Sequence, residues 1–138
     1  MNIFKSAGAV LKREDILKVS DIKRELVPVP EWGGDVYVKG MTGSERDKFE
    51  SSMITIKGKD RDVNLSNIRA KLASLSICDE NGKRLFTEND VQALSQKSAS
   101  ALQRVFEVAQ KLSGISDTDI SELTEEIKED PFEGSPSD

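Results

Sequence analysis

The sequence contains no histidine and a single cysteine, Cys78. The absence of histidine removes the commonest general base, the commonest metal ligand and the usual side chain that titrates near neutral pH. One cysteine cannot form an internal disulfide or supply a Cys-cluster metal site. Cys78 follows a predicted helix without a basic neighbour, so we expect a buried, unreactive thiol, compatible with a reducing cytoplasm.

Long apolar runs and the motifs of common enzymes are also missing. The N-terminal stretch is interrupted by Lys5 and lacks the apolar run of about 7–15 residues that a signal peptide needs. Nothing approaches the roughly 18–20 residues needed to span a bilayer. The sequence contains no Walker loop, G-x-G-x-x-G fingerprint or G-x-S-x-G elbow. We therefore predict that the protein is not an enzyme, holds no cofactor or metal, and does not insert in a membrane.

A hydrolase that uses only carboxylates is the remaining enzymatic alternative, because acidic residues are abundant. Such a site needs a formed cleft and, for sugars, aromatic residues that stack on the rings. Only 5% of the residues are aromatic, which disfavours this alternative.

The charge of the chain is distributed unevenly. Of the 25 acidic and 20 basic residues, nine acids and one lysine lie in 116–138. The body is therefore nearly neutral and the C-terminal end strongly acidic, which argues against nucleic-acid binding. With 138 residues, we predict one domain and a tail: a loosely ordered leader (1–23), an α+β domain (24–115) and a disordered, mobile acidic tail (116–138).

The stretch 26–50 holds the only tryptophan and the only tyrosine. The expected structure changes more sharply here than anywhere else in the sequence, from extended segments to a helix. Two short apolar alternations flank Gly33-Gly34, which predicts a β-hairpin at about 24–39. Pro28 and Pro30 cannot donate to a ladder, so the first strand should lie at an edge of the sheet. A helix should begin near 42–44 and turn Phe49, Met53 and Ile56 towards the core.

Three more helices and a second hairpin follow. We predict one helix over 65–77. A second should begin at Thr87, with Asp90 completing a capping box. A third should run from Ser98 or Ser100 to Gly114. Leu65 begins the apolar stripe of the first of these helices, and residues 57–64 should form a polar loop. Asn81-Gly82 predicts a two-residue turn in a short hairpin over 78–86, with Leu85 and Phe86 returning to the core. Residues 120–127 could form a further short helix capped by Ser116.

A protein of this composition and without catalytic motifs is best explained as a binding protein. Trp32 is the first candidate contact, since tryptophan is over-represented among interface hot spots, and Tyr37 and Phe132 are the others. For each of them, an ordinary place in the core or the tail is the alternative. The exposed edge of the hairpin is a place where a partner strand or a second copy of the chain could add.

Three stretches together resemble the tail assembly chaperones of long, flexible-tailed bacteriophages. They are PEWGGDVYV followed by TGSERD, then DENGKRLFTENDV, and then LSQKSASALQRVFEVA. The resemblance covers about 24–114. It does not cover residues 1–23 or the acidic end.

The resemblance implies a non-enzymatic assembly factor made in the cytoplasm of the infected host and absent from the mature virion. Such proteins bind the tape measure protein and help to recruit the major tail tube protein during tail morphogenesis. The shorter product of a frameshifted pair is the expected form, and the acidic end lies where a longer product would diverge. A small acidic adaptor or inhibitor of phage origin is the alternative.

Overall fold

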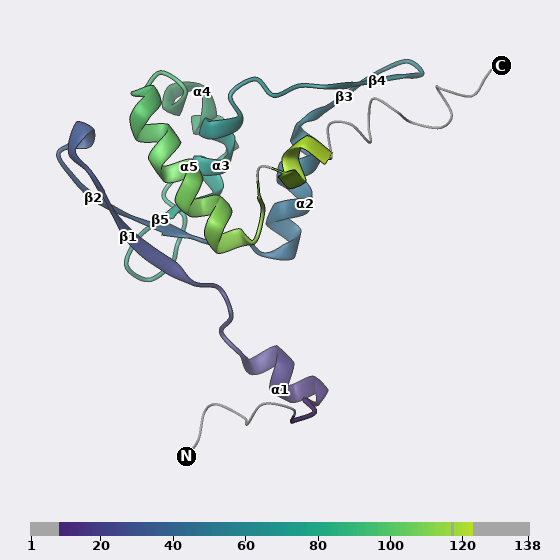
Figure 1. The fold of residues 1–138 in the computed structure, drawn as a ribbon, viewed down its shortest axis with the longest axis vertical. Helices are drawn as coiled ribbons and strands as arrows, with labels where there is room; N and C mark the ends of the chain where they lie inside the picture. The colour runs from purple at the N-terminus through teal and green to yellow at the C-terminus, as the bar shows by residue number, and fades with distance from the viewer. Residues whose placement is uncertain (1–8, 117, 123–138) are drawn as a thin grey trace.

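A three-stranded antiparallel sheet with α-helices packed against it forms the centre of the molecule (Figure 1). The computed structural model describes residues 9–116 and 118–122. Within them the chain order is α1 (Arg13–Lys18), β1 (Arg24–Val29), η1 (Pro30–Trp32), β2 (Gly34–Lys39), α2 (Gly43–Ser52), β3 (Ile54–Lys57), β4 (Asp60–Val63), α3 (Ile68–Ser76), β5 (Ile77–Cys78), η2 (Glu88–Asp90), α4 (Val91–Leu94) and α5 (Ala99–Ser113), where η marks a 3-10 helix. The predicted α+β class is confirmed.

The predicted N-terminal hairpin is present as β1 and β2, which pair from Arg24 opposite Lys39 to Val29 opposite Gly34. The sheet order is β1-β2-β5, so the proline-containing strand lies at an edge as predicted. Gly33 closes the turn with a φ of 78°, which a residue with a Cβ adopts at a cost. Val29 and Val38 are fully buried on the face that α5 covers.

Helices α2 and α5 begin at the positions that their capping residues predicted. Thr42 accepts a hydrogen bond from the backbone N–H of Glu45, whose carboxylate accepts one from the N–H of Thr42. Ser98 caps α5, and Gly114 ends it with a φ of 72°. The buried face of α5 is aliphatic and aromatic except for Gln110, and α5 packs against α3, β1 and β2 at once (Figure 1).

Two tight contacts fix the approach of β2 to the end of α5. The backbone N–H of Met41 donates to Ser113 Oγ at 2.9 Å. A Cβ placed on Gly40 would lie 2.6 Å from the carbonyl oxygen of Leu112. Only glycine therefore fits at position 40 without movement of the backbone.

The short hairpin over 78–86 is present, but its turn differs from the prediction. Gly82 has a φ of 85°, whereas Asn81 does not have a positive φ. The backbone N–H of Asp79 donates to the carbonyl of Lys83 at 2.8 Å, which leaves three residues in the loop. The Asp79 side chain accepts from the N–H groups of Asn81 and Lys83, and this local bonding selects the three-residue turn.

The largest difference between the structure and the sequence prediction lies between α2 and α3. Residues 57–64 are not a polar loop, because β3 and β4 pair there as a separate two-stranded hairpin. It extends away from the helices in Figure 1. Ile56 is 69% exposed and not in the core, because α2 ends at Ser52 and the chain turns into β3.

Besides Ile56, two leucines that were predicted to face the core are exposed. Leu65 precedes α3, which starts at Ile68 after Asn67 in a left-handed conformation. Leu85 is exposed beside Phe86, which packs against the core as predicted. Cys78 is buried, and this burial raises the pKa of its thiol, as expected for an inert cysteine.

The two ends of the described chain differ in how they meet the body. Helix α1 has no buried residue and lies apart from the rest of the chain in Figure 1. Residues 118–122 are helical, and Ile120 packs against the core. Ser116 caps this turn by accepting from the N–H of Asp119. No described helix is long and apolar enough to cross a membrane.

The division into leader, domain and tail remains a prediction. Most of the acidic tail, at 117 and 123–138, lies outside the described residues.

Candidate partner-binding surface

An open groove lies where the tip of the N-terminal hairpin meets α4. It has a volume of about 410 Å³, and its lining is mostly apolar. Its lining residues come from η1, the segment before η2, the end of η2, α4 and the loop after α4: Glu31, Trp32, Phe86, Asp90, Ala93, Leu94 and Lys97. We call it the Trp32 groove. A volume in the range of about 300–1,000 Å³ is typical of binding pockets.

Glu31 fixes the hairpin tip beside the groove. Its carboxylate accepts from Arg104 Nη1 at 2.7 Å and Nη2 at 3.0 Å, and from Ser100 Oγ at 2.9 Å. Hydrogen bonding to Arg104, then to its own backbone and to Ser100, lowers the pKa of Glu31 from 4.5 to about 2. The same contact raises the pKa of Arg104. The wall of the groove is therefore held on α5 by a charged pair rather than left free at the turn.

Trp32 is half-buried, packs against the core and lines the groove. Among the described residues, its buried Nε1 atom has no hydrogen-bond partner. Its inner side supports the hairpin, as the core alternative predicted, and its outer side lines the groove; whether a partner binds it stays a prediction. Phe86 and Leu94 complete the apolar floor, with Asp90 and Lys97 as charged residues beside them.

Tyr37 does not belong to this surface. Val36 and Val38 pack towards the core, so the alternation of β2 places Tyr37 on the opposite face of the sheet. There it lies between Leu26 and Cys78 in the strand register, with the Arg24 guanidinium 5.0 Å from its ring centroid. Phe132, the third candidate, lies outside the described residues.

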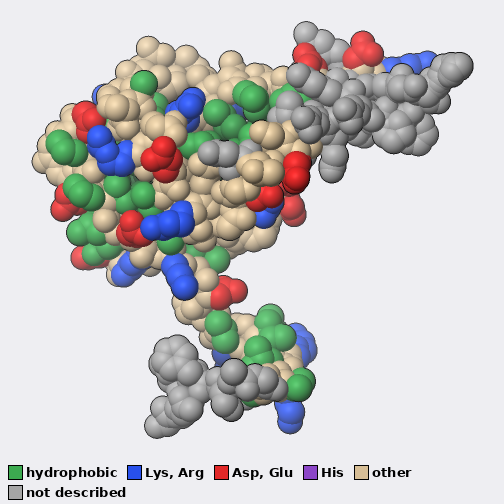
Figure 2. All heavy atoms as spheres, in the orientation of Figure 1, with side chains coloured by type: hydrophobic (Ala, Val, Ile, Leu, Met, Phe, Trp, Pro, Cys, Tyr) green, Lys and Arg blue, Asp and Glu red, His purple; other side chains and the backbone are tan. Residues whose placement is uncertain are grey.

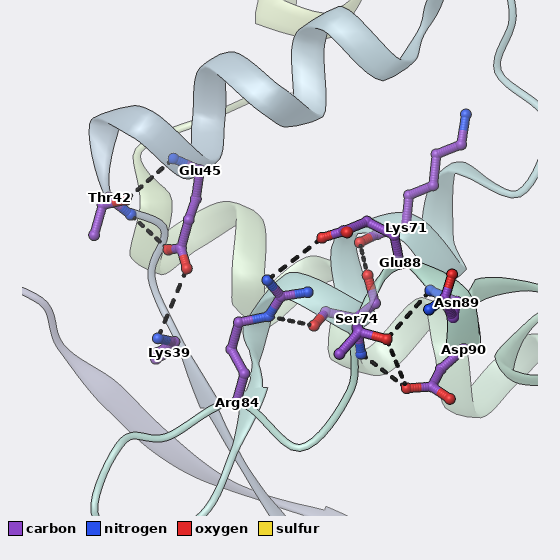
Figure 3. A network of polar contacts seen from close by, with 10 residues as sticks. Lys39, Thr42, Glu45, Lys71, Ser74, Arg84, Glu88, Asn89 and Asp90 are labelled. Carbon is purple, nitrogen blue, oxygen red and sulfur yellow. Dashed lines mark hydrogen bonds and ion pairs between the residues drawn. The ribbon is translucent and has the colours of Figure 1, made fainter.

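A second apolar groove, of about 280 Å³, lies on the other side of η2 and α4. Phe49, Leu75 and Val91 line it, and Lys48, Lys71 and Glu88 bring charge to it. Figure 3 shows the polar contacts nearby. Arg84 Nε donates to the carbonyl of Ser74 at 3.0 Å, and Arg84 Nη1 lies 3.9 Å from Glu88 Oε1 (Figure 3). The hydrogen bond ties the segment before η2 to α3, and η2 and α4 lie between the two grooves.

Both grooves combine apolar side chains with charged ones. Trp32 and Phe86 offer apolar area, and Asp90 is engaged in capping, since it accepts from the N–H of Thr87 at 2.8 Å. Within 9–116 and 118–122, no three acidic or cysteine side chains come together as metal ligands would. The arrangement favours binding of an apolar segment with polar flanks.

The three stretches that carry the family resemblance converge on the Trp32 groove. PEWGG supplies Glu31 and Trp32, and DENGKRLFTENDV supplies Phe86 and Asp90. The third stretch supplies Leu94 and Lys97, together with the residues that hold Glu31. Of the lining residues, only Trp32 was predicted from the sequence as a partner contact. The others were missed because a contact between the hairpin tip and α4 is formed by the fold and has no local signal.

Fold and surface together define a small α+β protein with an apolar groove at a hairpin tip. A model of the phage tail assembly chaperone family matches residues 12–129, and the chain belongs to this family. No curated protein matches the sequence. The solved structure of the bacteriophage HK97 tail assembly chaperone is similar, with 16% identity and a TM-score of 0.50 over 66% of this chain and 85% of that one. At this identity the likeness shows a shared fold.

Proposed function

We propose that this protein is a non-enzymatic chaperone that binds the tape measure protein of its phage through the Trp32 groove. It acts during tail morphogenesis in the host cytoplasm, helps to recruit the major tail tube protein, and is absent from the mature virion. It is the shorter product of a frameshifted pair.

The convergence of the three family stretches on one apolar groove carries this proposal. Residues far apart in the chain meet at a surface that the core does not fill, so the groove is free to receive a client. A chaperone for long apolar helices needs apolar area in a soluble surround, and tryptophan and phenylalanine contribute much area for little lost conformational freedom. Charged residues at the groove, such as Lys97, can select the flanks of the bound segment.

Co-expression with the tape measure protein encoded in the same phage genome tests the proposal. The wild-type chain should increase the soluble fraction of the tape measure protein and co-purify with it. Ala93→Glu places a charge in the groove at an exposed position of α4 and should abolish co-purification while the thermal unfolding of the chain changes little.

Gln92→Glu is the matched control, because Gln92 is exposed on the same helix and lines neither groove. Tyr37→Ala, on the opposite face of the sheet, should also leave co-purification intact. If Ala93→Glu and Gln92→Glu bind the tape measure protein equally, the groove is not the client site. A failure of the wild-type chain to co-purify would reject the client itself.

Tail tube recruitment is tested separately, by adding the purified tail tube protein to the complex of this chain with the tape measure protein. Retention of the tube protein by the complex, and by neither component alone, is the expected result. Frameshifting is tested on the coding DNA, where a slippery sequence should precede an overlapping reading frame.

A further inference from the structure

The second groove, on the other side of η2 and α4, has no part in the proposed client site. It has a volume of about 280 Å³ and a mostly apolar lining. We call it the Val91 groove. Its apolar side chains and its charged side chains come from α2, α3, η2 and α4: Phe49, Leu75 and Val91, with Lys48, Lys71 and Glu88. In the described chain the two grooves share no lining residue, so an occupant of the Val91 groove can be tested independently of the Trp32 groove.

The two lysines of the Val91 groove lack acidic partners. Lys71 Nζ donates to the backbone carbonyl of Ser52 at 3.0 Å, which is a neutral acceptor, and Lys48 is exposed. Among the described residues, neither ammonium group forms an ion pair with a carboxylate. The Glu88 carboxylate lies 3.9 Å from Arg84 Nη1, and the Lys71 side chain extends away from it in Figure 3. The groove therefore combines an apolar lining with uncompensated positive charge.

The chain itself contains a segment of the opposite character. On the face of the body shown in Figure 2, acidic and basic side chains are interspersed. Residues 123–138 instead contain six acids and one lysine, and three of the acids surround Phe132 in the sequence EDPFE, at 129–133. An aromatic ring flanked by carboxylates matches an apolar lining beside two ammonium groups.

The described chain ends near enough to the Val91 groove for this segment to reach it. Ile120 packs against the core, and it lines a small cavity together with Phe49, which also lines the Val91 groove. The ten residues from Glu122 to Phe132 span up to about 33 Å when extended. Helix α2, with its ten residues, is only about 15 Å long. The length of the chain therefore permits the contact.

We propose that segment 129–133 binds in the Val91 groove of its own chain. Phe132 covers the apolar lining, and the carboxylates beside it lie near Lys48 and Lys71. A short tether gives an effective concentration on the order of millimolar, which favours this contact over the same contact between two copies. The bound segment closes the Val91 groove to other apolar segments and leaves the Trp32 groove open.

Nuclear magnetic resonance on the isotope-labelled full chain tests this proposal without any client. The amides of 129–133 should have heteronuclear nuclear Overhauser effects close to those of α2, at every protein concentration. Phe132→Ala should lower these values and shift the amide resonances of 48–52 and 71–75, but not those of 30–34 at the Trp32 groove. Ser135→Ala is the matched control in the same segment of sequence and should change neither property.

A second pair of variants changes the groove and leaves the tail intact. Lys48→Glu replaces an attractive charge by a repulsive one, so it should lower the nuclear Overhauser effects of 129–133 as far as Phe132→Ala does. Lys59→Glu is the matched control, because Lys59 is also exposed but lies between β3 and β4 and lines neither groove. This control should leave the segment bound.

Three results would overturn the proposal. The first is a segment 129–133 that is as mobile in the wild type as in Phe132→Ala, which would favour the mobile tail expected from composition. The second is an equal effect of Lys48→Glu and Lys59→Glu. The third is order in 129–133 that disappears on dilution, which would assign the groove to the tail of a second copy. Because no tape measure protein is present and the Trp32 groove is unchanged in every variant, each of these results leaves the proposed function standing.

Discussion

Two hairpins of this protein have the same antiparallel pairing, but one is buried against a helix and the other is exposed to solvent. β1–β2 and β3–β4 are both antiparallel, and both have a glycine with positive φ at the turn, Gly33 and Gly58. In the first, Val29 and Val38 are fully buried beneath α5. In the second, Ile56 is 69% exposed, and no third strand from the described part of the chain joins the pair. We call them the anchored hairpin and the projecting hairpin.

The comparison shows that burial of one face, more than the turn, decides what a hairpin contributes. A two-stranded hairpin is only marginally stable in water unless it packs against other elements. The anchored hairpin gains a third strand, a helix across its inner face and the Glu31–Arg104 pair at its tip. It can therefore hold Trp32 in a fixed position, which a binding surface requires.

The largest expected effect comes from placing the same charge in each hairpin. Val38→Asp buries an unpaired carboxylate in the core and should lower the free energy of unfolding by more than about 4 kcal/mol, which leaves the chain unfolded or nearly so. Ile56→Asp should change it by less than about 0.5 kcal/mol, since the side chain is already in water. Urea unfolding followed by circular dichroism measures both, and similar losses would contradict the distinction.

Glycine substitutions at the two ends of β2, at Gly34 and at Gly40 just beyond it, provide a sharper test. Gly40→Ala places a methyl group against the Leu112 carbonyl and should cost about 1–3 kcal/mol. Gly34→Ala meets no atom within 4 Å and has no positive φ, so it should be neutral or stabilising by up to about 1 kcal/mol. Thermal unfolding of the two variants decides the point. Equal stability would mean that α5 does not hold the end of β2 closely.

The smallest expected effect concerns the charged pair at the hairpin tip. The pKa of Glu31 is about 2 in the folded chain against an ordinary 4.5. A depressed pKa stabilises the fold above the unfolded value, and this contribution is lost as the pH falls from 4.5 towards 2. Glu31→Gln should therefore be less stable than the wild type at pH 7, and the difference should shrink over this range.

Arg104→Gln should reproduce the pH profile of Glu31→Gln, because hydrogen bonding to Arg104 is the main cause of the shift. The double variant should add little to either single change. Urea midpoints at pH 7, 4.5 and 2.5 measure these differences. Additive effects of the two substitutions would show that the residues act separately.

The sequence predicted those parts of the fold that local chemistry determines. The Thr42, Thr87 and Ser98 caps, the Gly114 terminus and the alternation of Val27 and Val29 are readable because each depends on neighbours in the chain. The projecting hairpin was missed because Ile56 continues the helical spacing of Phe49 and Met53, and because β4 has no apolar residue except Val63.

The candidate site was predictable only in part. Trp32 stands out by composition, whereas its neighbours Phe86, Ala93 and Lys97 meet it through tertiary packing. The same limit explains Ile56, since helical spacing continues in the sequence beyond Ser52, where α2 ends. A periodic pattern shows which residues share a helix face, but it does not show where the helix stops.

Hydrogen exchange followed by mass spectrometry, on the free chain and on its complex with the tape measure protein, tests the central claim most directly. In the free chain, the amides of β1 and β2 should exchange slowly and those of β3 and β4 rapidly. Binding should add protection at 30–34 and 86–97, around the Trp32 groove, and leave β3–β4 unchanged. New protection confined to the projecting hairpin would contradict the account.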